Sequence, residues 1–192
     1  MYSLVPQSTG FNMSSIDISK VSSTGAYTGS GMFSDVYLMP NGEAIKTCNH
    51  ANSDAWLWWS IVAMQNPDSE HTPNIKSIHI NIHDNTFVAV MEALEDIDDD
   101  NEYIGPRAED AGETLFAECY ELCPFSLVND TGDGHWNWMR ADDGRNIWTD
   151  PFCYDGWRDI KADKGDRTRI NAIQEYLYEN PVEGITFERP RI

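Results

Sequence analysis

An Asn-Gly turn between two strand-like runs sets the first limit on how this chain folds. Residues 33–39 and 43–48 have the pattern of strands, and Pro40-Asn41-Gly42 separates them. Asn-Gly is a strong short-range signal of a β-hairpin because both residues tolerate positive φ angles. The sequence therefore predicts an antiparallel hairpin, and with it a fold that contains a sheet.

A helix and two further strands are predicted after the hairpin. The helix begins at Ser53 or Asp54 and ends before Pro67, and it is apolar on nearly every side, so it should pack against more than one neighbour. Residues 75–83 alternate apolar and polar side chains, whereas residues 86–94 are more apolar, which predicts one half-buried and one more buried strand. Later segments predict helices over 108–123 and 167–179 and a short β-like pair at 136–140 and 146–149.

The charge of the chain limits its partners. It has 32 Asp and Glu against 13 Lys and Arg, a formal net charge of −19 over 192 residues. This balance disfavours binding to a nucleic-acid backbone, whose affinity depends on Lys and Arg. It leaves open a basic protein partner, a divalent metal, or a decoy that mimics nucleic acid. Seven acids lie in residues 92–102, which predicts an acidic loop that interrupts the regular structure and can attract a basic protein.

The cysteines and the first residues indicate a compartment. Cys48, Cys119, Cys123 and Cys153 form no Cys-x-x-Cys pair, which favours reduced, partly buried thiols over disulfides or a zinc site. The first residues lack the basic start and apolar run of a secretory signal, and no apolar stretch is long enough to span a membrane. The sequence therefore predicts a cytoplasmic protein without a membrane partner.

Two glycines and a Lys around the hairpin suggest chemistry on phosphate. Gly29 and Gly31 lie between strand-like segments and not between a strand and a helix, which disfavours a Rossmann fingerprint or a P-loop. Small residues there let backbone N–H groups approach a phosphate, and Lys46 follows in the paired strand within Ala44-Ile45-Lys46. A glycine hairpin followed by a strand Lys is the phosphate-covering arrangement of protein kinases.

With these motifs the sequence resembles the eukaryotic-type protein kinase fold, and it is most similar to the small, divergent early Ser/Thr kinases of short-tailed bacteriophages. The resemblance covers about residues 25–157, and its most specific part is Asn137 placed thirteen residues before Asp150 in Thr149-Asp150-Pro151. It implies a kinase-like α+β fold. After a flexible lead-in at 1–24, residues 25–94 would form a small antiparallel N-lobe and residues 95–192 a reduced, mostly helical C-lobe.

The resemblance also implies roles for particular residues around Mg²⁺ and ATP. Phosphoryl transfer depends on positioning and on neutralising charge, which requires a cation on the phosphates, oxygen ligands for the metal, and a base near the attacking hydroxyl. By resemblance, Lys46 holds the α- and β-phosphates, Asn137 and Asp150 hold Mg²⁺, Asp133 is the base, and Gly29, Gly31 and the hinge residue Glu92 help to bind ATP.

The sequence departs from the kinase pattern in its catalytic loop and in its first helix. Asp133 precedes Asn137 by four residues where the family has five, and Asp130 precedes it by seven. The helix after Lys46 has no Glu to pair with that Lys, and Asp54 at its first turn is the only acid in reach.

Two functions are therefore kept open. One is a phage-type Ser/Thr protein kinase that transfers the γ-phosphate of ATP to proteins in the cytoplasm of an infected bacterium. The other is a catalytically inactive pseudokinase that binds and inhibits a host protein with a basic surface through its own acidic surface, including as a nucleic-acid mimic. Neither function requires direct binding to nucleic acid.

Overall fold

The computed structural model describes residues 26–30, 34–48, 54–97, 105–129, 137–155 and 168–187, so the lead-in predicted at 1–24 lies outside the described residues. Helices and strands are both present and mixed along the chain, which confirms the predicted α+β class. In chain order the elements are β1 (Ala26–Ser30), β2 (Ser34–Leu38), β3 (Glu43–Cys48), α2 (Ala55–Gln65), β4 (Ile75–Asn81), β5 (Thr86–Glu92), β6 (Leu94–Asp96), α3 (Gly105–Leu122), β7 (Leu127–Asn129), β8 (Trp138–Ala141), β9 (Asn146–Trp148), β10 (Phe152–Tyr154), α4 (Thr168–Glu179) and β11 (Ile185–Phe187).

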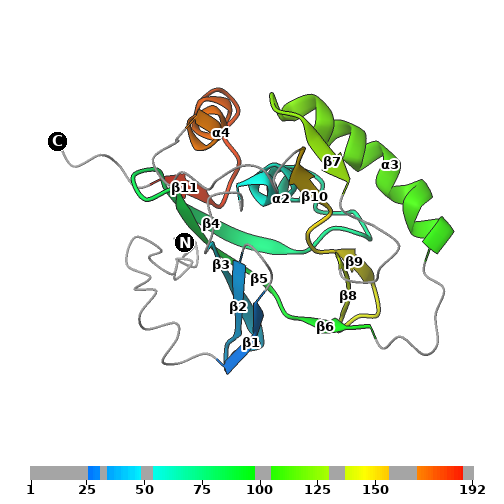
Figure 1. The fold of residues 1–192 in the computed structure, drawn as a ribbon. Coiled ribbons are helices and arrows are strands. Elements are labelled where there is room, and N and C mark those ends of the chain that lie inside the picture. The colour runs from blue at the N-terminus through cyan, green and yellow to red at the C-terminus, as the bar shows by residue number, and fades with distance from the viewer. Residues whose placement is uncertain are drawn as a thin grey trace, which may run out of the picture.

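Six strands form the main sheet, in the order β1-β2-β3-β5-β4-β11 (Figure 1). Neighbours in this sheet are antiparallel except β11, which runs parallel to β4. The predicted hairpin is confirmed as β2 and β3, with Leu38 opposite Ala44 beside the turn. Gly42 in that turn has a φ of 78°, a conformation that a residue with a side chain adopts only with strain.

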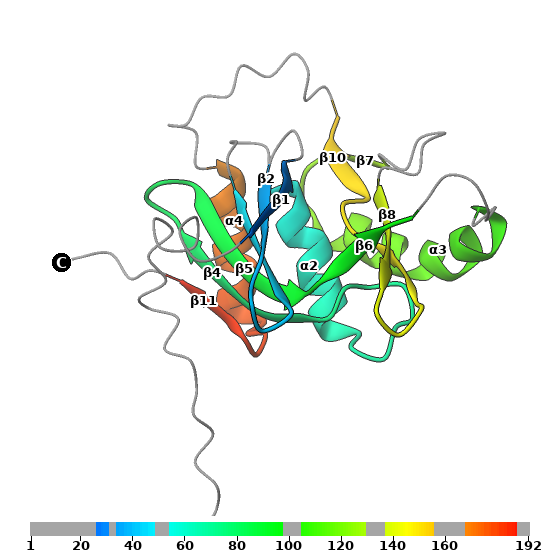
Figure 2. The same cartoon turned by 90° about the horizontal axis from the view of Figure 1, so that it is seen from below.

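Helices α2 and α4 lie on one face of the main sheet, and α3 lies beside α2 (Figures 1 and 2). Every residue of α2 from Ala55 to Ala63 is buried, and the helix contacts β4, β10 and α3. The prediction that α2 packs on more than one side is therefore confirmed. The isoleucines predicted to face the core from residues 75–83 are also buried, namely Ile75, Ile78, Ile80 and Ile82.

A second sheet begins inside the stretch that the sequence predicts to interrupt the regular structure. β6 pairs with β8, and β8 pairs with β9, so the prediction is wrong for residues 94–96. The acidic side chains of Glu95 and Asp96 are exposed to water, and Leu94 is partly buried opposite Ala141. The backbone of β6 can therefore pair with β8 without burying a charge. The rest of the acidic run, residues 98–102, lies outside the described residues.

The described part of residues 95–192 contains more strand than the predicted mostly helical lobe, because α3 and α4 alternate with short strands β7 to β11. The last of these, β11, returns to the main sheet, where Ile185 lies opposite Ile78. Gly184 precedes β11 with a φ of 89°, and a Cβ there would lie 2.8 Å from the carbonyl oxygen of Lys76. Glycine therefore permits this close approach of the two strands.

The described cysteine thiols are free and buried, in agreement with the expectation of reduced thiols. Burial raises the pKa of Cys119, and it raises the pKa of Cys123 to about 11. Both thiols are therefore protonated and weakly nucleophilic at neutral pH. Among the described helices, none combines the length and the apolar character needed to cross a bilayer.

Candidate functional site

Lys46 lies in the middle of the main sheet, on the face that α2 covers. Its neighbours across the sheet are Val36 on β2 and Ala89 on β5, and Ala89 is part of the core beneath α2. Directly opposite residues on antiparallel strands share a face, so the Lys46 side chain points toward the same core. Only 6% of Lys46 is exposed. Burying an ammonium costs free energy unless the charge is paired. The groups that contact the Lys46 ammonium therefore show where the candidate site lies.

The ammonium of Lys46 has one charged and one aromatic partner. Its Nζ lies 3.3 Å from Oδ2 of Asp150, and it lies 4.7 Å from the centroid of the Trp56 ring. The first contact neutralises the ammonium, and the second is a cation–π interaction. Lys46 and Asp150 are 104 residues apart in the chain, so the fold brings them together.

The β8–β9 hairpin explains why Asn137 and Asp150 are thirteen residues apart. The two strands, predicted as a short β-like pair, are confirmed, and they return the chain so that Trp148 lies opposite Trp138. Beyond this pair, the backbone N–H and the hydroxyl of Thr149 both donate to the carbonyl oxygen of Asn137, at 2.8 and 3.1 Å. Asn137 and Asp150 thus lie at the open end of one hairpin.

Trp56 of α2 also contacts the backbone at Thr149, next to Asp150. Its indole Nε1–H donates to the carbonyl oxygen of Thr149 at 2.9 Å, and its ring stacks on Phe87 with a centroid distance of 5.2 Å. One side chain therefore contacts both the Lys46 ammonium and the backbone just before Asp150. Sequence reasoning missed Trp56, because it looked for a carboxylate as the partner of Lys46. The sequence signal for Trp56 was the predicted helix after the Lys46 strand, which has several Trp residues and no acid from Ala55 to Gln65.

Asp54, at the start of α2, pairs with Arg169 and not with Lys46. It is 4% exposed at the start of α2, and its Oδ2 lies 3.6 Å from Nε of Arg169 on α4. The Arg169 guanidinium also lies over the ring of Tyr154, 4.2 Å from its centroid. Asp54 therefore joins α2 to α4, and this use of its carboxylate leaves Trp56 as the α2 partner of the Lys46 ammonium.

The predicted ATP-site residues do not all lie close to Lys46 in the described part of the chain. Gly29 lies in β1 opposite Val36, at an irregularity in the strand register, so Val36 is the residue between Gly29 and Lys46 across the sheet. Gly31 and the predicted base Asp133 lie outside the described residues. The structure therefore brings together Lys46, Asp150 and the backbone of Asn137, with Gly29 two strands away.

The carboxylate of Glu92, the predicted hinge residue, has two partners in the structure. One carboxylate oxygen accepts the backbone N–H of Asn74 at 2.7 Å, and the other accepts from Arg145 at 2.8 Å. Arg145 lies just before β9, so this pair joins the end of β5 to the β8–β9 hairpin. The Glu92 carboxylate therefore joins the main sheet to the turn of the β8–β9 hairpin, at the end of that hairpin away from Asn137 and Asp150.

The arrangement can neutralise phosphate charge and offer oxygen ligands to a metal. The Asp150 side chain is 29% exposed although its partner is buried, so the pair lies at an edge that water reaches. Carboxylate and amide oxygens such as those of Asp150 and Asn137 are the donors that Mg²⁺ prefers. An ammonium and a carboxylate in contact can also separate around a ligand that carries phosphate and metal together.

Substitution of Trp56 tests its hold on Lys46 without any ligand. Trp56→Leu removes the ring and the N–H donor, whereas Trp56→Phe keeps a smaller ring face and loses the hydrogen bond to Thr149. We expect the Leu variant to lose about 2 kcal/mol of unfolding free energy and the Phe variant about 1 kcal/mol. In protein labelled with ¹³C at the ε-carbons of its five lysines, the ring should shift the Lys46 ε-protons upfield in the wild type and in the Phe variant. An unchanged Lys46 signal in Trp56→Leu would show that the ring does not hold the ammonium.

No protein-family model matches this chain, and no curated protein matches its sequence.

Proposed function

We propose that this chain is a protein-kinase-type phosphotransferase that binds Mg·ATP at Lys46, Asn137 and Asp150. The observation that carries the proposal is the 3.3 Å contact between the ammonium of Lys46 and the carboxylate of Asp150. Lys46 comes from β3, the second strand of the Asn-Gly hairpin, and Asp150 follows the β8–β9 hairpin. The kinase resemblance predicts a phosphate-binding Lys and a metal-binding Asp at these two places. The antiparallel order β1-β2-β3-β5-β4 within the main sheet also supports the small N-lobe of that resemblance, and β11, from the segment assigned to the C-lobe, adds a parallel edge strand to it.

In this proposal the described residues divide the work of transfer. Lys46 neutralises the α- and β-phosphates. The ring of Trp56 on α2 positions the Lys46 ammonium next to Asp150. Asp150 and Asn137 are the ligands for Mg²⁺, which supplies charge neutralisation on the β- and γ-phosphates. Asp133, outside the described residues, is the proposed base for the attacking hydroxyl of a Ser or Thr in a host protein.

Thermal unfolding with and without Mg·ATP tests the proposal. A ligand at 100 times its dissociation constant adds about 2.7 kcal/mol to the stability of the folded state. For a chain of this size that free energy corresponds to a rise of about 5–10 °C in Tm. MgCl₂ alone is the control and should leave Tm unchanged. A Tm that does not respond to saturating Mg·ATP would overturn nucleotide binding at this site.

A second candidate, a pseudokinase, is favoured by the α2 contacts. The Lys46 ammonium meets a neutral ring on α2, and Asp54 is committed to Arg169. Such a protein would keep the fold and the nucleotide site without transfer, and would act by binding a basic host protein. A Mg·ATP-dependent rise in Tm without any incorporation of the γ-phosphate into this chain or into proteins of a bacterial lysate would favour this candidate.

A further inference from the structure

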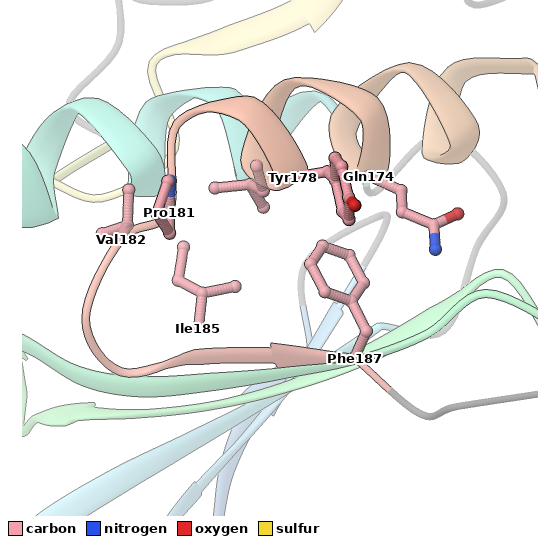
Figure 3. A pocket seen from close by; sticks show the side chains of 7 residues that line it. Gln174, Tyr178, Pro181, Val182, Ile185 and Phe187 are labelled. Carbon is pink, nitrogen blue, oxygen red and sulfur yellow. The ribbon is translucent and has the colours of Figure 1, made fainter.

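A groove lies between helix α4 and strand β11, at the edge of the main sheet away from the Lys46 strand. Its volume is about 300 Å³, and most of its lining is apolar; Figure 3 shows Tyr178, Pro181, Val182, Ile185 and Phe187 around it. In the sheet order, β5 and β4 separate β11 from β3. This α4–β11 groove is therefore not part of the candidate nucleotide site.

The aromatic side chain at the groove is unusually exposed. Tyr178 is 89% exposed, whereas Ile170, Ile173 and Leu177 on the core side of α4 are at most 5% exposed. In Figure 3 the Tyr178 ring stands beside the ring of Phe187 at the mouth of the groove. Large aromatic rings gain much from burial, and their polar tips still find partners at interfaces. The groove thus presents an apolar surface that a partner can cover.

Strand β11 adds a second feature, an outer edge. It is the last strand in the sheet order, so among the described strands β4 is its one neighbour. The carbonyl oxygen of Gly184 accepts the N–H of Ile78, which sets the direction of the ladder. In a parallel ladder alternate residues turn their backbone groups away from the partner, so the carbonyl of Ile185 and the N–H of Phe187 point outward. An extended segment can pair with such an edge while its side chains enter pockets beside it.

The charges around the groove define the chemistry of that segment. Glu175 and Glu179 are exposed on α4 on either side of Tyr178 in the chain, and Glu183 is exposed just before β11. The single base of residues 168–187 is Arg169, at the other end of α4, where it pairs with Asp54. The exposed charges on α4 and just before β11 are therefore acidic, and most of the groove lining is apolar, which complements a segment that carries Lys or Arg around an apolar side chain.

We infer that the α4–β11 groove is a docking site for an extended segment of a partner protein, in which an apolar or aromatic side chain is flanked by Lys or Arg. The apolar side chain enters the groove beside Tyr178 and Phe187, and the backbone pairs with β11. The basic residues face Glu175, Glu179 and Glu183. This inference does not depend on nucleotide binding, because the groove and the Lys46 site share no residues.

A labelled peptide of the sequence Lys-Leu-Lys-Phe-Lys-Leu-Lys provides a probe for the groove, and fluorescence anisotropy measures its Kd. The expected result is binding that weakens at least tenfold in the double variant Tyr178→Ser/Phe187→Ser. Tyr120→Ser, at a partly exposed aromatic on α3, is the matched control and should leave Kd unchanged. In ¹H–¹⁵N spectra the peptide should shift the amides of residues 185–187 most strongly. Circular dichroism of each variant checks that the fold is kept.

A pair of charge variants separates the groove from the net charge of the chain. Glu179→Gln/Glu183→Gln should weaken binding of the peptide several-fold. Glu95→Gln/Glu121→Gln removes the same charge at exposed positions on β6 and α3 and should leave Kd nearly unchanged. Absence of peptide binding, equal weakening by both pairs, or amide shifts away from β11 would each overturn the inference.

Discussion

Lys46→Met is expected to abolish detectable phosphate transfer from Mg·ATP, with a loss of about 100-fold or more. One preorganised charge at the reacting group typically contributes about 10²–10³ in rate, because a water-poor site strengthens electrostatic interactions. Lys46 is 6% exposed on a central strand, and in the described part of the chain it is the one cation within ion-pair distance of Asp150. Asp150→Asn should cause a loss of similar size, since it removes the proposed metal carboxylate. The measurement is incorporation of radiolabelled γ-phosphate into the chain itself or into proteins of a bacterial lysate.

Two surface substitutions with the same change of chemistry serve as controls. Lys76→Met removes a Lys whose side chain is 52% exposed and paired with Glu43, and Asp143→Asn neutralises a carboxylate that is 60% exposed. Both lie outside the Lys46–Asp150 pair and should keep wild-type transfer. If Lys46→Met and Asp150→Asn transfer phosphate as well as these controls, the proposed site is wrong.

Trp59→Ala is expected to cost about 3–5 kcal/mol of unfolding free energy, the largest effect of any single substitution considered. Trp59 is 0% exposed on α2, and its indole ring makes edge contacts with Phe116 and Phe152 at centroid distances of 5.6 and 6.0 Å. Its Nε1–H donates to the carbonyl oxygen of Trp148 at 3.0 Å. The substitution therefore leaves both a cavity and a buried acceptor without this donor.

Urea unfolding followed by circular dichroism measures this loss. Trp59→Phe keeps much of the volume but not the donor, so it should fall between the wild type and Trp59→Ala. Tyr178→Ala, at an 89% exposed aromatic, should change the unfolding free energy by no more than about 0.5 kcal/mol. A Trp59→Ala variant as stable as Tyr178→Ala would show that α2 does not anchor the core through this residue.

The local elements of the fold could be predicted from the sequence because their signals are local. Asn41-Gly42 predicts the β2–β3 hairpin, and the apolar run of residues 55–65 predicts a helix packed on several sides. Two of the strands that prediction missed depend on distant parts of the chain. β6 consists of three residues, two of them acidic, and becomes a strand because β8 lies beside it. β11 is equally short and pairs with a strand more than 100 residues earlier, which no local pattern reveals.

The candidate site was predictable in its charges but not in its neutral contacts. The resemblance to protein kinases led to Lys46, Asn137 and Asp150. The fold brings Lys46 into contact with Asp150, and Thr149, next to Asp150, bonds to the backbone of Asn137. The assumption that an ammonium requires a nearby carboxylate on α2 pointed to Asp54. The structure uses the face of Trp56 instead, because an aromatic ring attracts a cation without carrying a charge.

The parallel pairing of β11 with β4 has a consequence for how the chain is made. β4 is synthesised more than 100 residues before β11, and its hydrogen bond from the Ile78 N–H to Gly184 cannot form until residue 184 has left the ribosome. During that interval the backbone N–H and C=O groups of β4 that later pair with β11 form an open edge, which is a template for pairing with other chains. Completion of the main sheet is therefore a late event in biogenesis, and translation that stops before residue 184 would leave a sheet prone to aggregate.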